Sequence, residues 1–312
     1  MEQLEELKNE TEEKSKKAME EKLQKETEIA TKEEIKTEEK VIEGKSLKNQ
    51  KKKKLTIFGF SIIRLLAYFV IFSILGLIIE TLYGLVTKGV IESRKSFLYG
   101  PFCAIYGVGA VVMILGLQKF KKNNYTLFWG GFLIGSLVEY IVSWIGEMVF
   151  HVKWWDYSNL PFNINGRICI WFSLFWGVLA IYLMTYIHPK IDKFLDKFNP
   201  KILTIIVVTF TIIMFLDWCI SSFALKIFFT RLVNNYNLEL QDVSTYQEKY
   251  TKIYENETLK PIFDTLFSDE IMVKTFPNLK VTTKEGKVIL VRDILKDIQP
   301  YYFRVFTPSA KK

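Results

Sequence analysis

The chain divides into three stretches with different patterns of hydrophobic and polar residues. Residues 1–54 are almost entirely charged or polar and contain no aromatic side chain. Long apolar blocks dominate residues 55–225, and residues 226–312 return to a mixed pattern typical of a water-exposed fold. We therefore predict a disordered charged N-terminal tail, a transmembrane helical domain and an extramembrane C-terminal region, with boundaries after residues 54 and 225.

Five apolar segments in the middle stretch approach the length needed to cross a bilayer. The hydrocarbon core is about 30 Å thick, so a helix needs roughly 20 apolar residues to span it. The second segment is shorter than the others. The predicted spans are 60–86, 101–117, 125–150, 168–187 and 202–225. In the third span Gly131 and Gly135 have a spacing that allows a neighbouring helix to approach closely.

The C-terminal stretch favours a small α+β fold. Residues 226–275 favour helices, and the alternating residues 278–291 predict a β-hairpin whose turn lies at Glu285 and Gly286. The predicted fold class is therefore an all-α membrane protein. Its bundle of about five transmembrane helices lies between the charged tail and this α+β appendage.

The distribution of lysine and arginine predicts the orientation of the chain. The formal net charge is +8, and its densest part is the lysine run 51–54, directly before the first span. Basic residues in short flanks favour the cytoplasmic side. We predict a multi-pass protein of the cell membrane with a cytoplasmic N-terminus, so that the loop between the third and fourth spans and the C-terminal region lie outside. No base-stacking aromatic residues accompany the lysines, so we expect the lipid bilayer, and not nucleic acid, as the partner.

The sequence predicts neither a cofactor nor a metal site. The residues GKS at 44–46 lack the glycine that a phosphate-binding loop needs five positions earlier, where Glu39 stands. We therefore expect no ATPase site in this chain. A metal site at Glu147, His151 and Asp156 is disfavoured because the chain has only two histidines.

Ionisable side chains at membrane depth are costly, and each needs a partner, water or a function. In the third span Glu139, Ser143, Glu147 and His151 recur every four residues and form a polar stripe along one helix face. Two interpretations stay open. The stripe suits a path for cations or protons, and it also suits a structural seam that pairs with Arg167.

The loop before the fourth span places a cation beside a helix start. We expect Asn165 to cap the fourth helix, which leaves Arg167 in the first helical turn, where the helix dipole disfavours it. Arg167 then needs a negative partner: Asp156, Glu147, a lipid phosphate or an anionic substrate group. We predict a polar cluster of Glu147, Asp156, Asn165 and Arg167 that joins the third and fourth helices. The full set of candidate site residues, without assigned catalytic roles, is Glu80, Glu139, Glu147, Asp156, Asn163, Asn165, Arg167 and Asp217.

Several segments resemble one bacterial family. Residues 76–80 (GLIIE), residues 96–111 (SFLYGPFCAIYGVGAV), the block 139–177 and residues 267–281 (FSDEIMVKTFPNLKV) are similar to the putative ABC transporter type IV proteins. This group is CmpB-like and is also described as putative ABC transporter permeases. One departure is Ala104, where the family pattern has proline. The resemblance implies a multi-pass membrane protein assigned to transport, with a separate ATPase subunit.

Three functions stay open at this point. The first is an ABC-transporter-permease-like transport protein of unknown substrate, with Glu139, Glu147, Arg167 and Asp217 lining or gating the path. Because five short helices give a thin pathway, such a protein would need a partner subunit or a homo-oligomer. The second is a membrane-embedded enzyme acting on a lipid or isoprenoid phosphate, and the third is a non-catalytic membrane scaffold.

Overall fold

The computed structural model describes residue 19 and residues 56–121, 123–150, 152–241 and 243–307. The tail predicted for residues 1–54 therefore lies, apart from Met19, outside the described residues. The chain splits into two compact units, Met1–Thr56 and Ile57–Lys312. Apart from Thr56, all features described below belong to the second unit.

Four long helical stretches confirm the prediction of an all-α membrane protein. They are α2 (Ile62–Lys88), α4 (Asn124–Phe150), α7 (Pro200–Tyr236) and a stretch that runs from α5 (Ile170–Tyr182) through the π-helical turn η2 (Leu183–Ile187) into α6 (His188–Leu195). All four are long and apolar enough to cross a membrane. Strands β1 (Thr56–Ile57) and β2 (Phe60–Ser61) precede α2.

The second predicted span forms a shorter helix, α3 (Ala104–Leu117), which the 3₁₀ turn η1 (Gln118–Phe120) extends. With about 1.5 Å of rise per residue, the stretch is some 25 Å long. Its last residue in the α-helix, Leu117, shares a buried core with Leu65 near the start of α2 and Leu195 at the end of α6. Its first turn packs at the opposite end of α2, where Tyr106 donates a hydrogen bond to Glu80. The short helix therefore runs between the two ends of the bundle, as its neighbours do.

Small residues bring the helices of the bundle together. A Cβ atom on Gly131 would lie 2.2 Å from Cβ of Ala180, and one on Gly135 would lie 2.5 Å from Cβ of Trp176. Both partners belong to α5, which confirms the close approach predicted for this pair of glycines. The α4–α5 contact therefore depends on the absence of side chains at these two positions.

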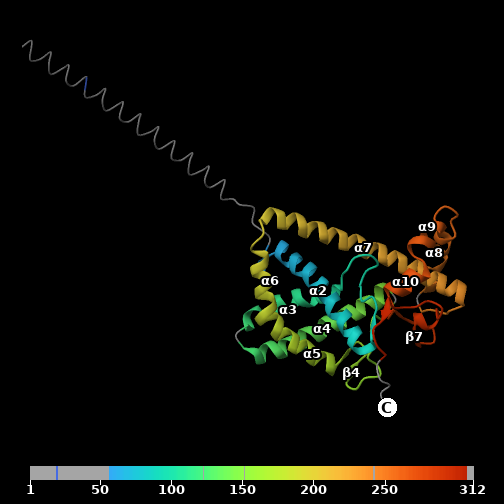
Figure 1. The fold of residues 1–312 in the computed structure, drawn as a ribbon, viewed down its shortest axis with the longest axis horizontal. Helices are drawn as coiled ribbons and strands as arrows, with labels where there is room; N and C mark the ends of the chain where they lie inside the picture. The colour runs from blue at the N-terminus through green and yellow to red at the C-terminus, as the bar shows by residue number, and fades with distance from the viewer. Residues whose placement is uncertain (1–18, 20–55, 122, 151, 242, 308–312) are drawn as a thin grey trace, which may run out of the picture. The chain divides into compact units, whose positions relative to one another are not determined.

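The C-terminal region is built on the end of α7. Its elements are η3 (Val243–Thr245), α8 (Gln247–Tyr254), α9 (Lys260–Leu266), α10 (Asp269–Thr275), the antiparallel pair β6 (Lys280–Thr282) and β7 (Val288–Leu290), and η4 (Val291–Asp293). The predicted hairpin is confirmed. Figure 1 shows α8, α9 and α10 gathered along the C-terminal part of α7. Helix α7 passes the predicted boundary at residue 225 without a break, and Leu225, Phe228 and Met272 share one core.

Two loops join this region at the same end of the bundle. Strand β3 (Val90–Ile91), which follows α2, pairs antiparallel with β8 (Phe303–Arg304). In the α4–α5 loop the backbone amide of Lys153 donates to the carbonyl of Lys280 over 3.0 Å. Leu98 and Val152 contribute to the core of the C-terminal region. The loops and the C-terminal region therefore form one continuous structure around the ends of α2 and α4.

Candidate functional site

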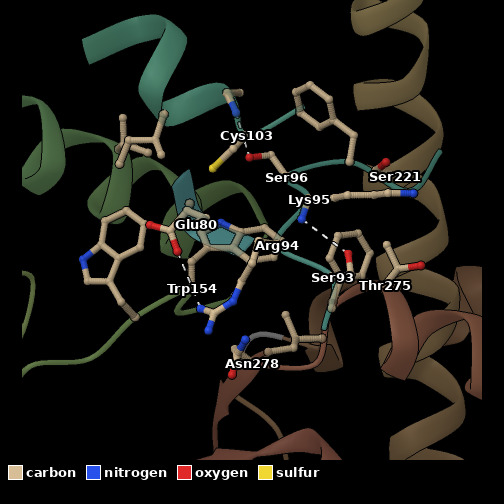
Figure 2. Close-up of a pocket in the computed structure, with 18 of the residues that line it drawn as sticks. Glu80, Ser93, Arg94, Lys95, Ser96, Cys103, Trp154, Ser221, Thr275 and Asn278 are labelled. Carbon is tan, nitrogen blue, oxygen red and sulfur yellow. Dashed lines mark hydrogen bonds and ion pairs between the residues drawn. The ribbon is translucent and has the colours of Figure 1, made fainter. Parts of the chain in front are cut away.

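A cavity of about 480 Å³ lies where these loops, the helix ends and the C-terminal region meet. Its volume falls in the usual range for small-molecule sites, about 300–1,000 Å³. The charged and polar side chains that line it include Glu80, Ser93, Arg94, Lys95, Ser96 and Asn278 (Figure 2). Its aromatic wall includes Tyr83, Trp154, Trp155, Tyr157, Phe172 and Trp218. The cavity therefore combines a small polar end with a large apolar wall.

Arg94 is the central cation of the polar end. Its Nη1 lies 3.6 Å from Oε2 of Glu80, and its Nη2 lies 3.0 Å from Oε1 of Glu92. Figure 2 shows the guanidinium between Glu80 and Asn278. A Cβ atom on Gly84 would lie 2.7 Å from Nη2, so α2 needs a glycine where the guanidinium packs. The Nε and Nη2 atoms are buried and form no hydrogen bond with any residue that the structure describes.

Glu92 anchors Arg94 and connects it to the C-terminal region. Its carboxylate accepts hydrogen bonds from Nζ of Lys88 over 2.7 Å and from Nδ2 of Asn278 over 3.1 Å, and Nη1 of Arg292 lies 3.7 Å away. Burial alone would raise the pKa of Glu92, but these hydrogen bonds and the nearby cations outweigh it and lower the pKa. Glu92 is therefore a buried anion held by several cations.

Sequence reasoning missed Glu92 and Arg94. Both lie in a short polar segment, residues 87–96, that reads as a plain connection between two spans. The signal that could have found them is the alternation of opposite charges directly after an apolar helix. Their partners Asn278 and Arg292 are almost 200 residues away in the chain, so the sequence gives no indication of which charges meet.

Glu80 and Glu139 lie in the same part of the bundle. Glu80 lines the cavity and accepts a hydrogen bond from the Tyr106 hydroxyl over 3.0 Å. Glu139 is buried and accepts hydrogen bonds from the Tyr157 hydroxyl over 2.9 Å and from Nε1 of Trp176 over 3.0 Å. Because Tyr157 also lines the cavity, Glu139 is one hydrogen bond away from it.

Arg167, in the loop between α4 and α5, pairs with Glu147 near the end of α4. Nη2 of Arg167 forms an ion pair with Oε2 of Glu147, and its Nη1 donates to the Ser143 hydroxyl over 3.3 Å. Nζ of Lys153 lies 3.7 Å from the other oxygen of Glu147. Two members of the predicted polar stripe thus contact Arg167, as the structural interpretation of the stripe requires. His151, the fourth member, lies outside the described residues.

The position predicted for Arg167 within a helix is wrong. Strands β4 (Asn163–Ile164) and β5 (Ile168–Cys169) form an antiparallel hairpin whose loop contains Arg167. Asn165 and Gly166 both have positive φ, 54° and 66°. Helix α5 starts only at Ile170, with Cys169 as its N-cap. The Asn-Gly dipeptide favours a tight hairpin turn over a helix cap. Arg167 therefore lies before the helix, and the effect of the helix dipole on the first helical turn does not apply to it.

The remaining loop residues mainly fix the chain path. Asp156 accepts a hydrogen bond from the backbone amide of Ser158 over 3.0 Å, and Oδ1 of Asn163 accepts one from the amide of Gly166 over 3.0 Å. Nδ2 of Asn165 donates to the Tyr140 hydroxyl over 2.9 Å. These contacts account for three of the polar residues that the sequence placed in the candidate set.

Asp217 holds the loop before α3 against α7. Its carboxylate accepts hydrogen bonds from the amides of Tyr99 over 3.1 Å and Gly100 over 2.6 Å. One turn further along α7, the Ser221 hydroxyl accepts from the amide of Leu98 over 2.7 Å. Two buried side chains of a membrane helix thus satisfy three loop amides, and they position the segment that carries Arg94.

A second, partly exposed polar cluster lies at the other end of the bundle and was not predicted. Nε of Arg64 donates to Oδ1 of Asp192 over 2.9 Å, and its Nη1 donates to Oδ1 of Asp196 over 2.8 Å. The Tyr68 hydroxyl also bonds Asp192, and Nε2 of His188 lies 3.3 Å from that hydroxyl. These contacts tie the amphipathic helix α6 to the start of α2. Among the residues that the structure describes, no group of three or more His, Cys, Asp or Glu is arranged to hold a metal ion.

Comparison with known proteins identifies the family. The family model described as putative ABC-transporter type IV matches residues 67–222, which is half of the chain. The matched part contains Glu80, Arg94, Arg167 and Asp217. It also contains most of the residues that line the cavity. No curated protein and no solved structure matches the chain. The chain belongs to the putative ABC-transporter type IV family.

Proposed function

We propose that this protein is a membrane-embedded transport component that works with a separate ATPase subunit, and that the cavity at Arg94 is its solute site. One observation carries the proposal: an ion pair, Arg94 with Glu80, borders a largely apolar cavity at the end of a bundle of apolar helices. A charged pair in such surroundings is costly to bury. The pair has a function if a charged solute replaces one partner and binds the other. The family description supports transport as the class of activity.

All four path residues expected from the sequence have structural partners. Arg167 and Glu147 pair with each other, and Asp217 binds loop amides. The alternative of an enzyme acting on a lipid phosphate needs Arg167 as the phosphate ligand. Because Arg167 is paired with Glu147, this alternative is less well supported. Among the candidate residues, Glu80 lines the cavity, and Glu139 is connected to it by the hydrogen bond from Tyr157.

We propose an orientation with five passes, in which the N-terminus is cytoplasmic and the cavity lies on the outer side. It rests on the path of α3 between the two ends of the bundle and on the lysine run 51–54. Single cysteines introduced by Leu160→Cys and Lys197→Cys, after replacement of the three native cysteines, test it. In intact cells an impermeant maleimide should label position 160 and should reach position 197 only after permeabilisation. The reverse result would invert the orientation.

The transport proposal is tested with the complex purified from native membranes in mild detergent and reconstituted into liposomes. An ATPase subunit should co-purify at a fixed ratio, and its rate of ATP hydrolysis should change when Val142→Trp fills the cavity. Lys252→Gln, on the exposed surface of α8, is the control and should leave the rate unchanged. A complex without an ATPase subunit would refute the proposal. A complex whose hydrolysis ignores the cavity variant would favour the scaffold.

A further inference from the structure

We propose that the cavity binds an amphiphile with a single anionic group, whose anion contacts Arg94 and whose apolar chain lies along the aromatic wall. This inference deepens the proposed function, because it names the class of solute for the same cavity. It concerns binding alone and can be measured without an ATPase subunit or ATP. Its failure is therefore distinguishable from failure of the transport proposal.

The charges around the cavity favour an anion. Its charged lining consists of Arg94, Lys95 and Glu80. Nζ of Lys95 donates to the carbonyl of Tyr99 over 3.2 Å and is thus engaged with the loop backbone. Arg94 is the cation that remains for a ligand. Behind it, Lys88 and Arg292 approach the same carboxylate, Glu92, and compete with Arg94 for it.

The hydrogen bonds of Arg94 are incomplete. A guanidinium carries five N–H donors and binds carboxylate or phosphate through pairs of them. The Arg94 side chain is only 14% exposed, and its nearest Glu80 oxygen is 3.6 Å away, beyond ordinary hydrogen-bond distance. Its Nε has no hydrogen-bond partner among the described residues, and its Nη2 has the Glu92 carboxylate as an ion-pair partner at 3.0 Å. Because Nε and Nη2 are buried, an anionic oxygen entering the cavity would meet Nη1, whose nearest Glu80 oxygen is too far away for a hydrogen bond.

The rest of the wall suits an apolar chain. Val142 and Ile145 from α4, Trp218 from α7 and Trp154 from the α4–α5 loop line the cavity. Tyr83, Ile145 and Trp218 remain 49%, 41% and 38% exposed, so the cavity is not sealed between the helices. All three lie on helices apolar enough to cross a membrane. A chain in the bilayer therefore has apolar surface to follow as it enters.

A free inorganic anion fits this wall less well. It would lose its hydration shell on all sides, and most of the lining cannot return hydrogen bonds. An amphiphile exposes only its head group to that cost, and its chain gains from burial against the aromatic side chains. The head group alone and the chain alone are therefore the two comparisons that test the inference.

The experiment measures equilibrium binding of radiolabelled dodecyl phosphate to the full chain in phosphatidylcholine nanodiscs, with the signal of empty nanodiscs subtracted. Dodecanol and inorganic phosphate are the competitors. We expect saturable binding of dodecyl phosphate, with dodecanol about tenfold weaker or worse and no competition by inorganic phosphate at similar concentration. Equal affinity for dodecyl phosphate and dodecanol would overturn the role of the anion. Competition by inorganic phosphate would show a free-anion site instead.

Three variants locate the binding. Arg94→Gln should weaken dodecyl phosphate binding about tenfold or more, as expected for the loss of a hydrogen bond to a charged group. Lys95→Gln removes the same charge from the cavity lining and should change the affinity less than threefold, because this lysine is bound to the Tyr99 carbonyl. Val142→Trp fills the apolar part and should abolish binding while Arg94 stays in place. If Arg94→Gln does not fold, Val142→Trp and the competitors decide: unchanged binding in Val142→Trp would overturn the proposal.

Discussion

Replacing Glu92 should loosen the C-terminal region from the membrane bundle. Glu92 has a side chain that is 1% exposed, and Lys88, Arg94 and Arg292 all lie within 4 Å of its carboxylate. The change Glu92→Gln keeps the size of the side chain and removes a negative charge that these three cations share. They would then repel one another beside a loop that carries strand β3.

The magnitude follows from the burial of the partners. Removing one member of a buried ion pair costs about 3–5 kcal/mol, because the other charge stays uncompensated. Lys88 and Arg292 are 36% and 28% exposed and can regain water, whereas Arg94 is 14% exposed. We therefore expect the lower end, about 3 kcal/mol. With an entropy of unfolding of about 2.1 cal/mol/K per residue, this corresponds in a chain of 312 residues to a fall in melting temperature of roughly 5 °C.

Hydrogen exchange of the purified protein, followed segment by segment, is the assay. The amides of β3, β6 and β8 should exchange about a hundredfold faster in Glu92→Gln, since 1.36 kcal/mol corresponds to a factor of ten. Amides in the α4–α5 contact should keep their rates. Glu239→Gln, whose side chain is 78% exposed and lies 3.8 Å from Lys284, is the control and should change stability by less than about 0.5 kcal/mol. Equal exchange in the Glu92 variant and this control would refute the role of Glu92.

Three further predictions concern stability. Because the pKa of Glu92 is lowered, its ionised form stabilises the folded protein at any pH above the ordinary carboxyl pKa of about 4.3. This stabilisation is lost as the pH falls through the lowered pKa. Acid should therefore reduce the melting temperature of the wild type more than that of Glu92→Gln. Gly131→Leu should lower the free energy of unfolding by about 1–3 kcal/mol, because its Cβ would lie 2.2 Å from Cβ of Ala180. Gly109→Ala, whose Cβ would meet nothing within 4 Å, should be neutral or stabilising. Equal melting temperatures for the two variants would contradict this prediction. A double-mutant cycle of Arg167→Gln and Glu147→Gln should give a coupling of about 1 kcal/mol, since both side chains keep some exposure, and strictly additive effects would show that the ion pair contributes nothing.

The local pattern predicted the helices and the hairpin because each depends on neighbouring residues. Apolar runs gave the membrane helices, and the alternation in residues 278–291 gave β6 and β7. The end of α7 was not predictable in this way, because hydropathy marks where apolar residues stop and not where the helix stops. Residues 226–236 contain neither glycine nor proline, and α7 continues through them to Tyr236.

The site was harder to predict, because it depends on contacts between distant segments. The ion pair of Arg167 with Glu147 could be anticipated, since both lie close to one loop. The same loop misled the prediction of its geometry, because Asn before Gly has two meanings, a helix cap and a hairpin turn. Arg94 and Glu92 gained their importance only from Asn278 and Arg292, which the C-terminal fold brings to them.

The pairing of β3 with β8 has a consequence for biosynthesis. Ile91 emerges from the ribosome roughly two hundred residues before its partner Phe303. At about 5–20 residues per second, the loop after α2 waits some 10–40 s for the strand that completes its hydrogen bonds. For most of that interval Glu92 and Arg94 have neither Asn278 nor Arg292, and the cavity forms only after residues 275–279, which line it, have been made. A stop codon shortly before Thr275 would therefore leave the membrane helices insertable and the cavity unfinished.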